Sequence, residues 1–252
     1  MQELAKLPKS LATLKKPPTT LYFEGDPTLL SKKMISIVGT RRPSLYTKEM
    51  TSLLAKKFAQ IGYVVVSGAA MGVDALAHKG AFTNTIAVMA NSLDLTYPAV
   101  NKKLINDMRN QSLILSEYPK TTPATKYSFV LRNRIVVALG ECLIITEADL
   151  NSGSLRSFEY AKELGKKVYV LSHRVGESLG TQELLADGLA TAITNLDEFV
   201  SSFGELVGID DELSYFNTPK SLAQALEEFG DRVYEFELEG LVEIKNLRVK
   251  RL

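Results

Sequence analysis

The chain has very few of the residues that form disulfides or bind transition metals. Its 252 residues include one cysteine, Cys142, and two histidines. A single cysteine cannot form a disulfide within the chain, and its apolar surroundings predict that it is buried. Both points favour a reducing compartment, and we expect a cytoplasmic protein. With so few sulfur and imidazole ligands, no zinc site is expected, and we predict no metal and no cofactor.

The chain also lacks an excess of charge of one sign and any long apolar run. Its 30 lysine and arginine residues almost balance its 29 acidic residues, which leaves a net charge of +1. Proteins that bind nucleic acid without specificity are often strongly basic, so such a role would need a local basic patch here. The N-terminus has lysines but no continuous apolar segment, so we expect no signal peptide and no membrane partner.

The main pattern in the sequence is an alternation of short apolar runs and amphipathic stretches. The amphipathic stretches predict helices at Thr47–Ile61, Val73–Phe82 and Ser154–Leu164. The apolar runs predict strands at 34–38, 63–66, 85–90, 113–115, 142–146 and 167–171. Continuous apolar strands between helices are typical of a mainly parallel sheet covered on both faces. The predicted fold class is therefore α/β.

The two ends of the chain read differently from this central region, which we place at 34–207. Leu4, Leu7, Leu11 and Leu14 recur at helical spacing before a proline pair, so residues 1–33 are predicted as an arm with a short helix. Residues 208–218 are acidic and polar and are predicted as a linker. Residues 219–252 suggest a helix, a hairpin and a basic end, which would fit a small winged-helix-like module.

Three glycine-bearing turns follow predicted strands. They are Gly39-Thr40-Arg41-Arg42, the run from Ser67-Gly68-Ala69 to Gly72, and Asn151-Ser152-Gly153-Ser154. Open α/β sheets bind ligands outside the carboxyl ends of their strands, where backbone N–H groups at helix starts suit phosphate. Arg41 and Arg42 add guanidinium groups that match phosphate geometry. The alternative is a solvated arginine pair, and for the third turn a helix cap.

The segment from Lys126 to Arg134 is basic and contains aromatic residues, among them Phe129. Such a segment can neutralise phosphates and offer a surface on which an unpaired base stacks. The alternative is that Phe129 belongs to the core and the cations are solvated. Asp74 and His78 lie four residues apart on one predicted helix, and a structural hydrogen bond between them is favoured over an acid–base pair.

Taken together, these motifs resemble the DprA/Smf family (DNA-processing protein A). The resemblance runs from about Pro17 to Ala192. It rests on the three turns, with the second continuing to His78, on Leu93-Asp94-Leu95-Thr96-Tyr97-Pro98, Ser116-Glu117-Tyr118-Pro119 and Arg132-Asn133-Arg134-Ile135-Val136, and on Glu147-Ala148. It implies an extended Rossmann-like domain that binds single-stranded DNA. Members act in natural transformation and deliver incoming strands to the recombinase RecA.

The resemblance implies a role for individual residues. Arg41 and Lys126 would meet phosphates, and Phe129 would contact a base. The expected strand-binding residues are Arg41, Arg42, Ser67, Gly68, Ala69, Gly72, Lys126, Phe129, Arg132, Asn133, Asn151, Ser152, Gly153 and Ser154. Single-stranded DNA, RecA and a second copy of the chain, bound through the late helices of the main domain, are the expected partners. No catalytic residue is expected.

The chain departs from the family pattern at two places on the pocket rim. Asn91-Ser92 stands where glycine is usual, and Ser172-His173 replaces a frequent Pro-Gly pair. The alternative function is a Rossmann-like nucleotide enzyme, such as a nucleotide phosphoribohydrolase of the LOG type. Its Pro-Gly-Gly-x-Gly-Thr-x-x-Glu signature is only partly present, because Glu159 is there but the glycine–threonine step is not. A dinucleotide site is disfavoured by the lack of G-x-G-x-x-G.

Overall fold

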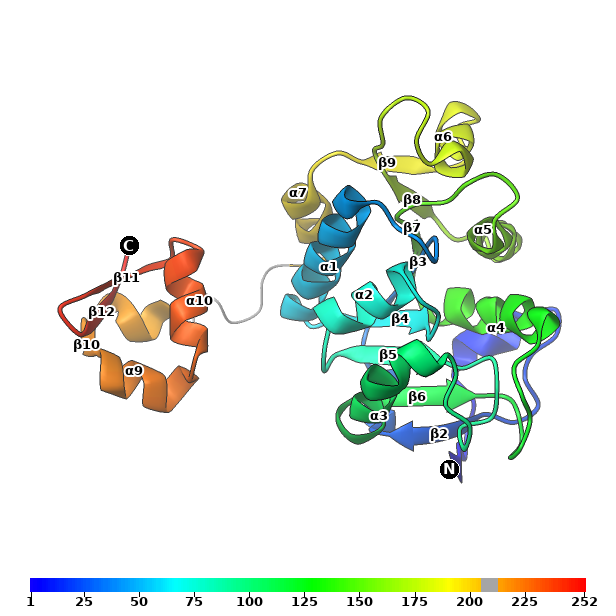
Figure 1. Ribbon diagram of the computed structural model, residues 1–252, viewed down its shortest axis with the longest axis horizontal. Coiled ribbons are helices and arrows are strands. Elements are labelled where there is room, and N and C mark those ends of the chain that lie inside the picture. The colour runs from blue at the N-terminus through cyan, green and yellow to red at the C-terminus, as the bar shows by residue number, and fades with distance from the viewer. Residues whose placement is uncertain (205–212) are drawn as a thin grey trace. The chain divides into compact units, whose positions relative to one another are not determined.

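The computed structural model describes residues 1–204 and 213–252 (Figure 1). The contacts divide the chain into two compact units, with the boundary after Gly204. Within the described residues, no helix is both long and apolar enough to cross a membrane.

The first unit is built on a nine-stranded sheet with the order β1-β2-β6-β5-β4-β3-β7-β8-β9. Strands β3 to β9 pair in parallel, while β1 and β2 join one edge in antiparallel pairs. The prediction of a mainly parallel sheet is confirmed. The strand bounds are β1 Gln2–Glu3, β2 Tyr22–Gly25, β3 Met34–Val38, β4 Val64–Gly68, β5 Thr85–Val88, β6 Leu113–Ser116, β7 Leu143–Ile145, β8 Val168–Leu171 and β9 Thr191–Ile193.

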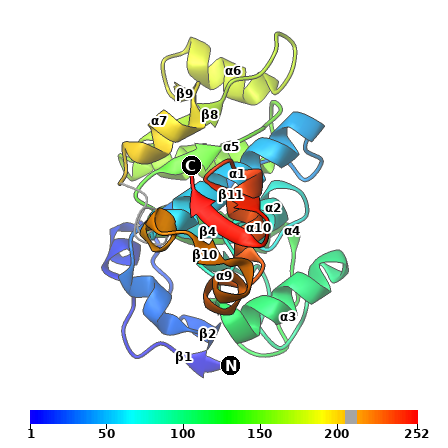
Figure 2. The same cartoon turned by 90° about the vertical axis from the view of Figure 1, so that its left-hand side faces the viewer.

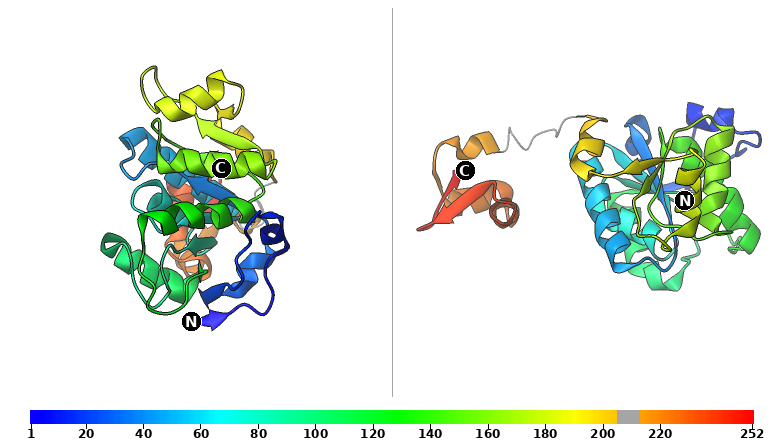
Figure 3. Two further views of the ribbon diagram at one scale, coloured as in Figure 1. Left: turned by 90° about the vertical axis from the view of Figure 1, so that its right-hand side faces the viewer. Right: turned by 90° about the horizontal axis from the view of Figure 1, so that it is seen from above.

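Helices cover both faces of this sheet. The α-helices are α1 Leu45–Gln60, α2 Val73–Gly80, α3 Lys102–Gln111, α4 Lys126–Leu139, α5 Gly153–Glu163, α6 Leu179–Ala186 and α7 Leu196–Ser201. Helices α4 and α5 lie on one face, and α1, α2, α3 and α7 on the other (Figures 1 and 3). In β4, Val64 and Val66 pack toward α4 while Val65 packs toward α1. Burial on both faces explains why the strands read as continuous apolar runs.

The N-terminal arm differs from its prediction. The leucine spacing predicted a helix, but the chain forms β1, a short 3₁₀ helix at Lys9–Thr13 and then β2. Leu11, Leu14 and Leu21 are buried in the same core as the α4 side of the sheet. Their spacing therefore reflects contact with that core and not one face of a helix. Because β2 pairs with β6, the arm covers an edge that the parallel sheet would otherwise expose.

The second unit is a small helical module with a three-stranded sheet of order β10-β12-β11 (Figures 1 and 2). Its elements are a 3₁₀ helix at Tyr215–Asn217, β10 Lys220–Ser221, α9 Leu222–Phe229, α10 Arg232–Leu238, β11 Val242–Lys245 and β12 Arg248–Arg251. Two helices followed by a hairpin are consistent with a winged-helix-like module.

The predicted linker at 208–218 needs a correction. Its first part, 208–212, lies outside the described residues. Leu213 and Phe216 are buried in the core of the second unit, together with Val233 and Phe236. An acidic and polar composition suggested a solvated linker, but these two apolar side chains pack into the module. The described part of the predicted linker therefore belongs to the folded unit.

We expect Leu21→Ala to destabilise the first unit strongly. Leu21 is fully buried in the core beneath α4, and truncating such a leucine typically costs about 2–4 kcal/mol. Leu45→Ala is the matched control, because Leu45 is 71% exposed and its loss should change the free energy of unfolding by less than about 0.5 kcal/mol. Urea unfolding followed by circular dichroism measures both. Equal stability of the two variants would show that the arm is not part of the core.

Candidate functional site

The carboxyl ends of β3 and β7 form the point where the order of the sheet reverses. From β3 the chain adds β4, β5 and β6 on one side, then crosses over to place β7, β8 and β9 on the other. In open α/β sheets the crevice at such a switch point is the usual ligand site. The loops that leave β3, β4 and β7 are the three predicted glycine-bearing turns, so all three lie at this edge.

Backbone hydrogen bonds join the first turn to the start of α2 and to the segment after β7 that leads into the third turn. The Thr40 N–H donates to the Glu147 carbonyl at 2.9 Å, and the Val73 N–H donates to the Thr40 carbonyl at 3.1 Å. Gly72 has a φ of 78°, and a Cβ there would lie 2.7 Å from the Cα of Arg41. Only glycine fits both the conformation and the space. This close approach holds the turn before α2 directly against the Arg41 loop.

Arg41 and Phe129, which the sequence predicts for one site, are in contact. The Arg41 guanidinium carbon lies 5.0 Å from the centroid of the Phe129 ring, a cation–π arrangement. The centroid of the Phe129 ring is also 5.9 Å from that of the Tyr97 ring, and Tyr97 is 49% exposed. The sequence analysis missed Tyr97 as a site residue, although the Tyr97-Pro98 motif was a signal. Arg41, Phe129 and Tyr97 form a cationic and aromatic row that we call the stacking row.

Lys126 is the first residue of α4 and is exposed. The helix is capped by a reciprocal pair, in which the Ser128 N–H donates to Thr125 Oγ1 at 3.0 Å and the Thr125 N–H to Ser128 Oγ at 2.8 Å. Phe129 lies one turn further on the same face. A cation at the positive end of a helix does not favour the helix, and the first turn has no acidic residue. Lys126 therefore adds an exposed positive charge one helical turn from Phe129, at a position that the helix dipole does not favour.

The third turn brings the start of α5 to α4. The Asn133 side-chain amide lies 3.4 Å from the Gly153 carbonyl, and Asn151 has a φ of 57°. Ser152 is the N-cap residue, yet its buried hydroxyl forms no hydrogen bond with the described residues. A Cβ at Gly153 would meet open space. The N–H groups that begin α5 are thus left without a side-chain cap, as an anion site requires.

Two residues predicted to touch a ligand point into the protein. The Ser67 hydroxyl donates to the Ile37 carbonyl at 2.6 Å and is fully buried. The Arg132 side chain is 4% exposed, donates to the Val88 carbonyl and to Asn133 Oδ1, and lies 4.0 Å from Asp74. This corrects the expectation that both side chains form surface contacts. The alternation of cations and aromatics on α4 did not reveal that two of its cations have partners inside the protein: Arg132, and Arg134, which is buried and pairs with Glu117 at 2.6 Å.

The burial of Arg132 also explains Gly68, because a Cβ at that position would collide with the guanidinium. Ala69 and Ser154 are buried as well. Gly68 and Ala69 therefore have only main-chain groups to offer a ligand. Arg42, in contrast, is exposed on the loop beside Arg41.

Asp74 and His78 are both buried, but they do not bond to each other. His78 contacts Thr85 Oγ1 at 2.7 Å and the Gly68 carbonyl at 2.5 Å, while the Ala70 N–H lies 3.4 Å from Asp74. Burial raises the pKa of Asp74, and the Arg132 charge opposes that shift. Burial lowers the pKa of His78 to about 4, so the ring is neutral near pH 7. Both residues support the turn after β4.

The polar residues that replace glycine at 91–92 also hold loops in place. Asn91 donates to the carbonyls of Ser92 and Leu95, both at 2.8 Å. The Thr122 N–H donates to the Ser92 hydroxyl at 3.1 Å. These bonds fix the segment that leads into α4 and so position the helix start that presents Lys126.

The chain is similar to a family of known proteins. The model of the protein family described as "DNA recombination-mediator protein A" matches residues 2–204. The DNA processing protein DprA of Bacillus subtilis is 38% identical over 165 residues, which cover 64% of this chain and 56% of that protein. The protein Smf of Synechocystis is 33% identical over 212 residues, covering 81% of this chain and 53% of that protein. The chain thus spans about half the length of these curated relatives.

A solved structure extends the similarity to three dimensions. The DNA processing protein A of Helicobacter pylori, described for its single-stranded DNA binding mode, superposes with a TM-score of 0.79 at 43% identity. The match covers 80% of this chain and 94% of that structure.

We expect the stability of the first unit to fall as the pH drops from about 6.5 to about 4. The unfolded chain protonates His78 near pH 6.5, whereas the folded chain does so only near pH 4. The unfolded state therefore binds more protons in this window. At pH 5.5 the loss from this residue should be about 1.4 kcal/mol. Urea unfolding at pH 7.5 and 5.5 measures it, and His78→Gln, although less stable, should show a shallower pH dependence. The same slope in both proteins would contradict the assignment.

Proposed function

Because the chain belongs to the DprA/Smf family of DNA recombination-mediator proteins, we propose that it binds single-stranded DNA at the carboxyl edge of its sheet. The observation that carries this proposal is the contact of Arg41 with Phe129, with Lys126 one helical turn away. It brings the Arg41 cation from the loop after β3 to the aromatic ring and the cation at the start of α4.

The mechanism is electrostatic and steric. Arg41 and Lys126 neutralise phosphates of the strand, and the uncapped start of α5 donates N–H groups to a further phosphate. Phe129 and Tyr97 offer ring surfaces to unpaired bases. In duplex DNA the bases are stacked and paired inside the helix, so they cannot reach these rings. The site therefore prefers single strands.

The wider role follows from the family. We propose that the protein acts in the cytoplasm as a recombination mediator, holds incoming strands during natural transformation and helps to load RecA on them. Self-association through the late helices of the first unit belongs to the same proposal. No catalytic step is included, because the turn from Asn151 to Ser154 lacks the glycine–threonine step of the nucleotide phosphoribohydrolases.

Arg41→Ala should weaken binding of a labelled oligo-dT about tenfold or more at moderate salt. The variant loses one phosphate contact and one side of the stacking row, so the slope of log affinity against log salt should fall by about 0.7. Fluorescence anisotropy over a salt series measures both quantities, with the duplex form as a second ligand.

The matched control is Lys162→Ala, which removes one positive charge from the last turn of α5, the end far from Gly153. It should bind as the wild type does. Equal affinity of the wild type for duplex and single strand would contradict the site. If the wild type binds no strand, the alternative of a nucleotide phosphoribohydrolase becomes the favoured hypothesis, and nucleotide hydrolysis is then the activity to measure.

Lys126→Gln should separate binding from stability. Removing a cation from the first turn of α4 should leave the protein as stable as before or up to about 1 kcal/mol more stable. The affinity for oligo-dT should nevertheless fall several-fold, because a phosphate contact is lost. Thermal unfolding and anisotropy on the same samples give the two values. A parallel loss of stability and affinity would instead assign Lys126 to the fold.

A further inference from the structure

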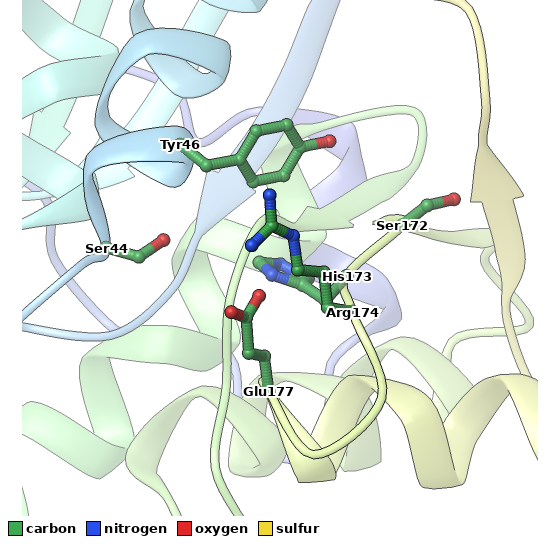
Figure 4. Close-up of a pocket in the computed structure, with 6 residues that line it drawn as sticks. All are labelled: Ser44, Tyr46, Ser172, His173, Arg174 and Glu177. Carbon is green, nitrogen blue, oxygen red and sulfur yellow. The ribbon is translucent and has the colours of Figure 1, made fainter.

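A second candidate site, a pocket, lies at the same edge of the sheet as the loop that carries Arg41. It has a volume of about 510 Å³ and is lined by Ser44, Tyr46, Ser172, His173, Arg174 and Glu177 (Figure 4). Ser44 and Tyr46 come from the start of α1, and the other four from the loop between β8 and α6. Since β3, β7 and β8 are neighbours in the sheet, these two segments flank the end of β7.

The walls of this pocket are tied to the end of β7. The Glu147 carboxylate accepts from the N–H of Ser44 at 3.0 Å and from its hydroxyl at 2.9 Å. His173 donates from Nε2 to the Thr146 carbonyl at 2.7 Å. The Gln182 side chain donates to the carbonyl of Arg174, which holds the loop after β8. The pocket is therefore preformed by hydrogen bonds to sheet and helix and does not depend on a ligand for its shape.

The lining combines an aromatic surface with two free charges. The Tyr46 ring is 42% exposed and meets the His173 ring edge to face, with centroids 5.5 Å apart. The Arg174 guanidinium and the Glu177 carboxylate point into the space beneath the Tyr46 ring (Figure 4). Among the described residues neither charge has an ion-pair partner within 4.0 Å. Both remain available to a ligand.

The Tyr46 ring, the Arg174 guanidinium and the Glu177 carboxylate match the base and the phosphate of one nucleotide. The Tyr46 ring suits the face of a base, and the Arg174 guanidinium suits a phosphate. A carboxylate accepts hydrogen bonds from base N–H groups, such as the N4 amino group of cytosine. Thymine has a carbonyl oxygen at the corresponding position. This oxygen is an acceptor, so it cannot donate to the Glu177 carboxylate.

The pocket and the proposed strand site share one segment of the chain. Arg41 lies on the loop after β3, and Tyr46 lies in the first turn of α1, which this loop enters. A free mononucleotide fits less well, because its terminal phosphate carries up to two negative charges. The pocket offers one guanidinium beside a carboxylate, which suits the single charge of a phosphodiester.

We propose that this pocket is a second nucleotide subsite of the bound strand, which takes one unpaired base and favours cytosine over thymine. Tyr46 stacks on the base, Arg174 binds the neighbouring phosphate and Glu177 accepts from the amino group of the base. The inference rests on the proposed function, since the first part of the strand must be held at Arg41 and Phe129.

Anisotropy with oligo-dT and oligo-dC of about 4 to 16 nucleotides, the span that one strand-binding domain covers, tests the subsite. The wild type should gain affinity once the strand extends beyond the stacking row. Tyr46→Ala and Arg174→Ala should each lower the affinity for long strands at least about fivefold and leave the affinity for the shortest strands unchanged. Tyr46→Phe keeps the ring and should behave as the wild type. Glu177→Gln should lose the preference for oligo-dC.

The controls separate this inference from the proposed function. Arg41→Ala should weaken binding of oligonucleotides of every length. Lys162→Ala should not weaken binding at any length. If the wild type binds strands and Arg41→Ala does not, but Tyr46→Ala and Arg174→Ala bind normally at all lengths, only the second subsite is refuted. If the wild type binds no strand, the proposed function fails. Tight binding of free dCMP that Tyr46→Ala abolishes would make the pocket a mononucleotide site and overturn the strand subsite.

Discussion

The candidate site depends on the hydrogen bond and the ion pair that the buried Arg132 guanidinium forms. A charge inside a protein is costly unless it is paired and hydrogen-bonded. Arg132 has the Val88 carbonyl and the Asp74 carboxylate within reach, and these partners come from β5 and α2. The guanidinium therefore connects α4 to two other parts of the sheet edge. Because Phe129 lies one turn before it on the same helix, fixing Arg132 also aims Phe129 at Arg41.

The small residues of the second turn follow from this constraint. Gly68 leaves room for the guanidinium, and its carbonyl in turn accepts from His78, which burial keeps neutral. Gly72 then lets the same turn reach the backbone of Arg41. The run of glycine and alanine that suggested phosphate binding in the sequence thus has a structural role. It packs a buried cation on one side and positions an exposed cation on the other.

The sequence could predict what depends on local pattern. Apolar runs located β3 to β8. The turn after β3 pointed to Arg41, and the basic aromatic segment that forms the start of α4 pointed to Lys126 and Phe129 as candidates for one site. The sequence could not predict what depends on distant partners. In the sequence Arg132 looked like a surface cation such as the exposed Lys126, and its partners Val88 and Asp74 are distant in the chain. The leucines of the arm matched a helix although they contact a core. The second pocket requires β8 to lie next to β7, which no local signal encodes.

The charge balance of the chain fits a site that selects by geometry. Arg41, Lys126 and Arg174 stand at the sheet edge together with Glu147 and Glu177, so this edge is not a uniformly basic surface. General attraction would favour duplex DNA, which has the higher charge density. In the proposed site, cations stand among carboxylates and aromatic rings, so a strand would bind only where its phosphates and unpaired bases reach the matching groups. A net charge of +1 is compatible with the proposed nucleic-acid binding, because discrimination would then come from the spacing of a few groups.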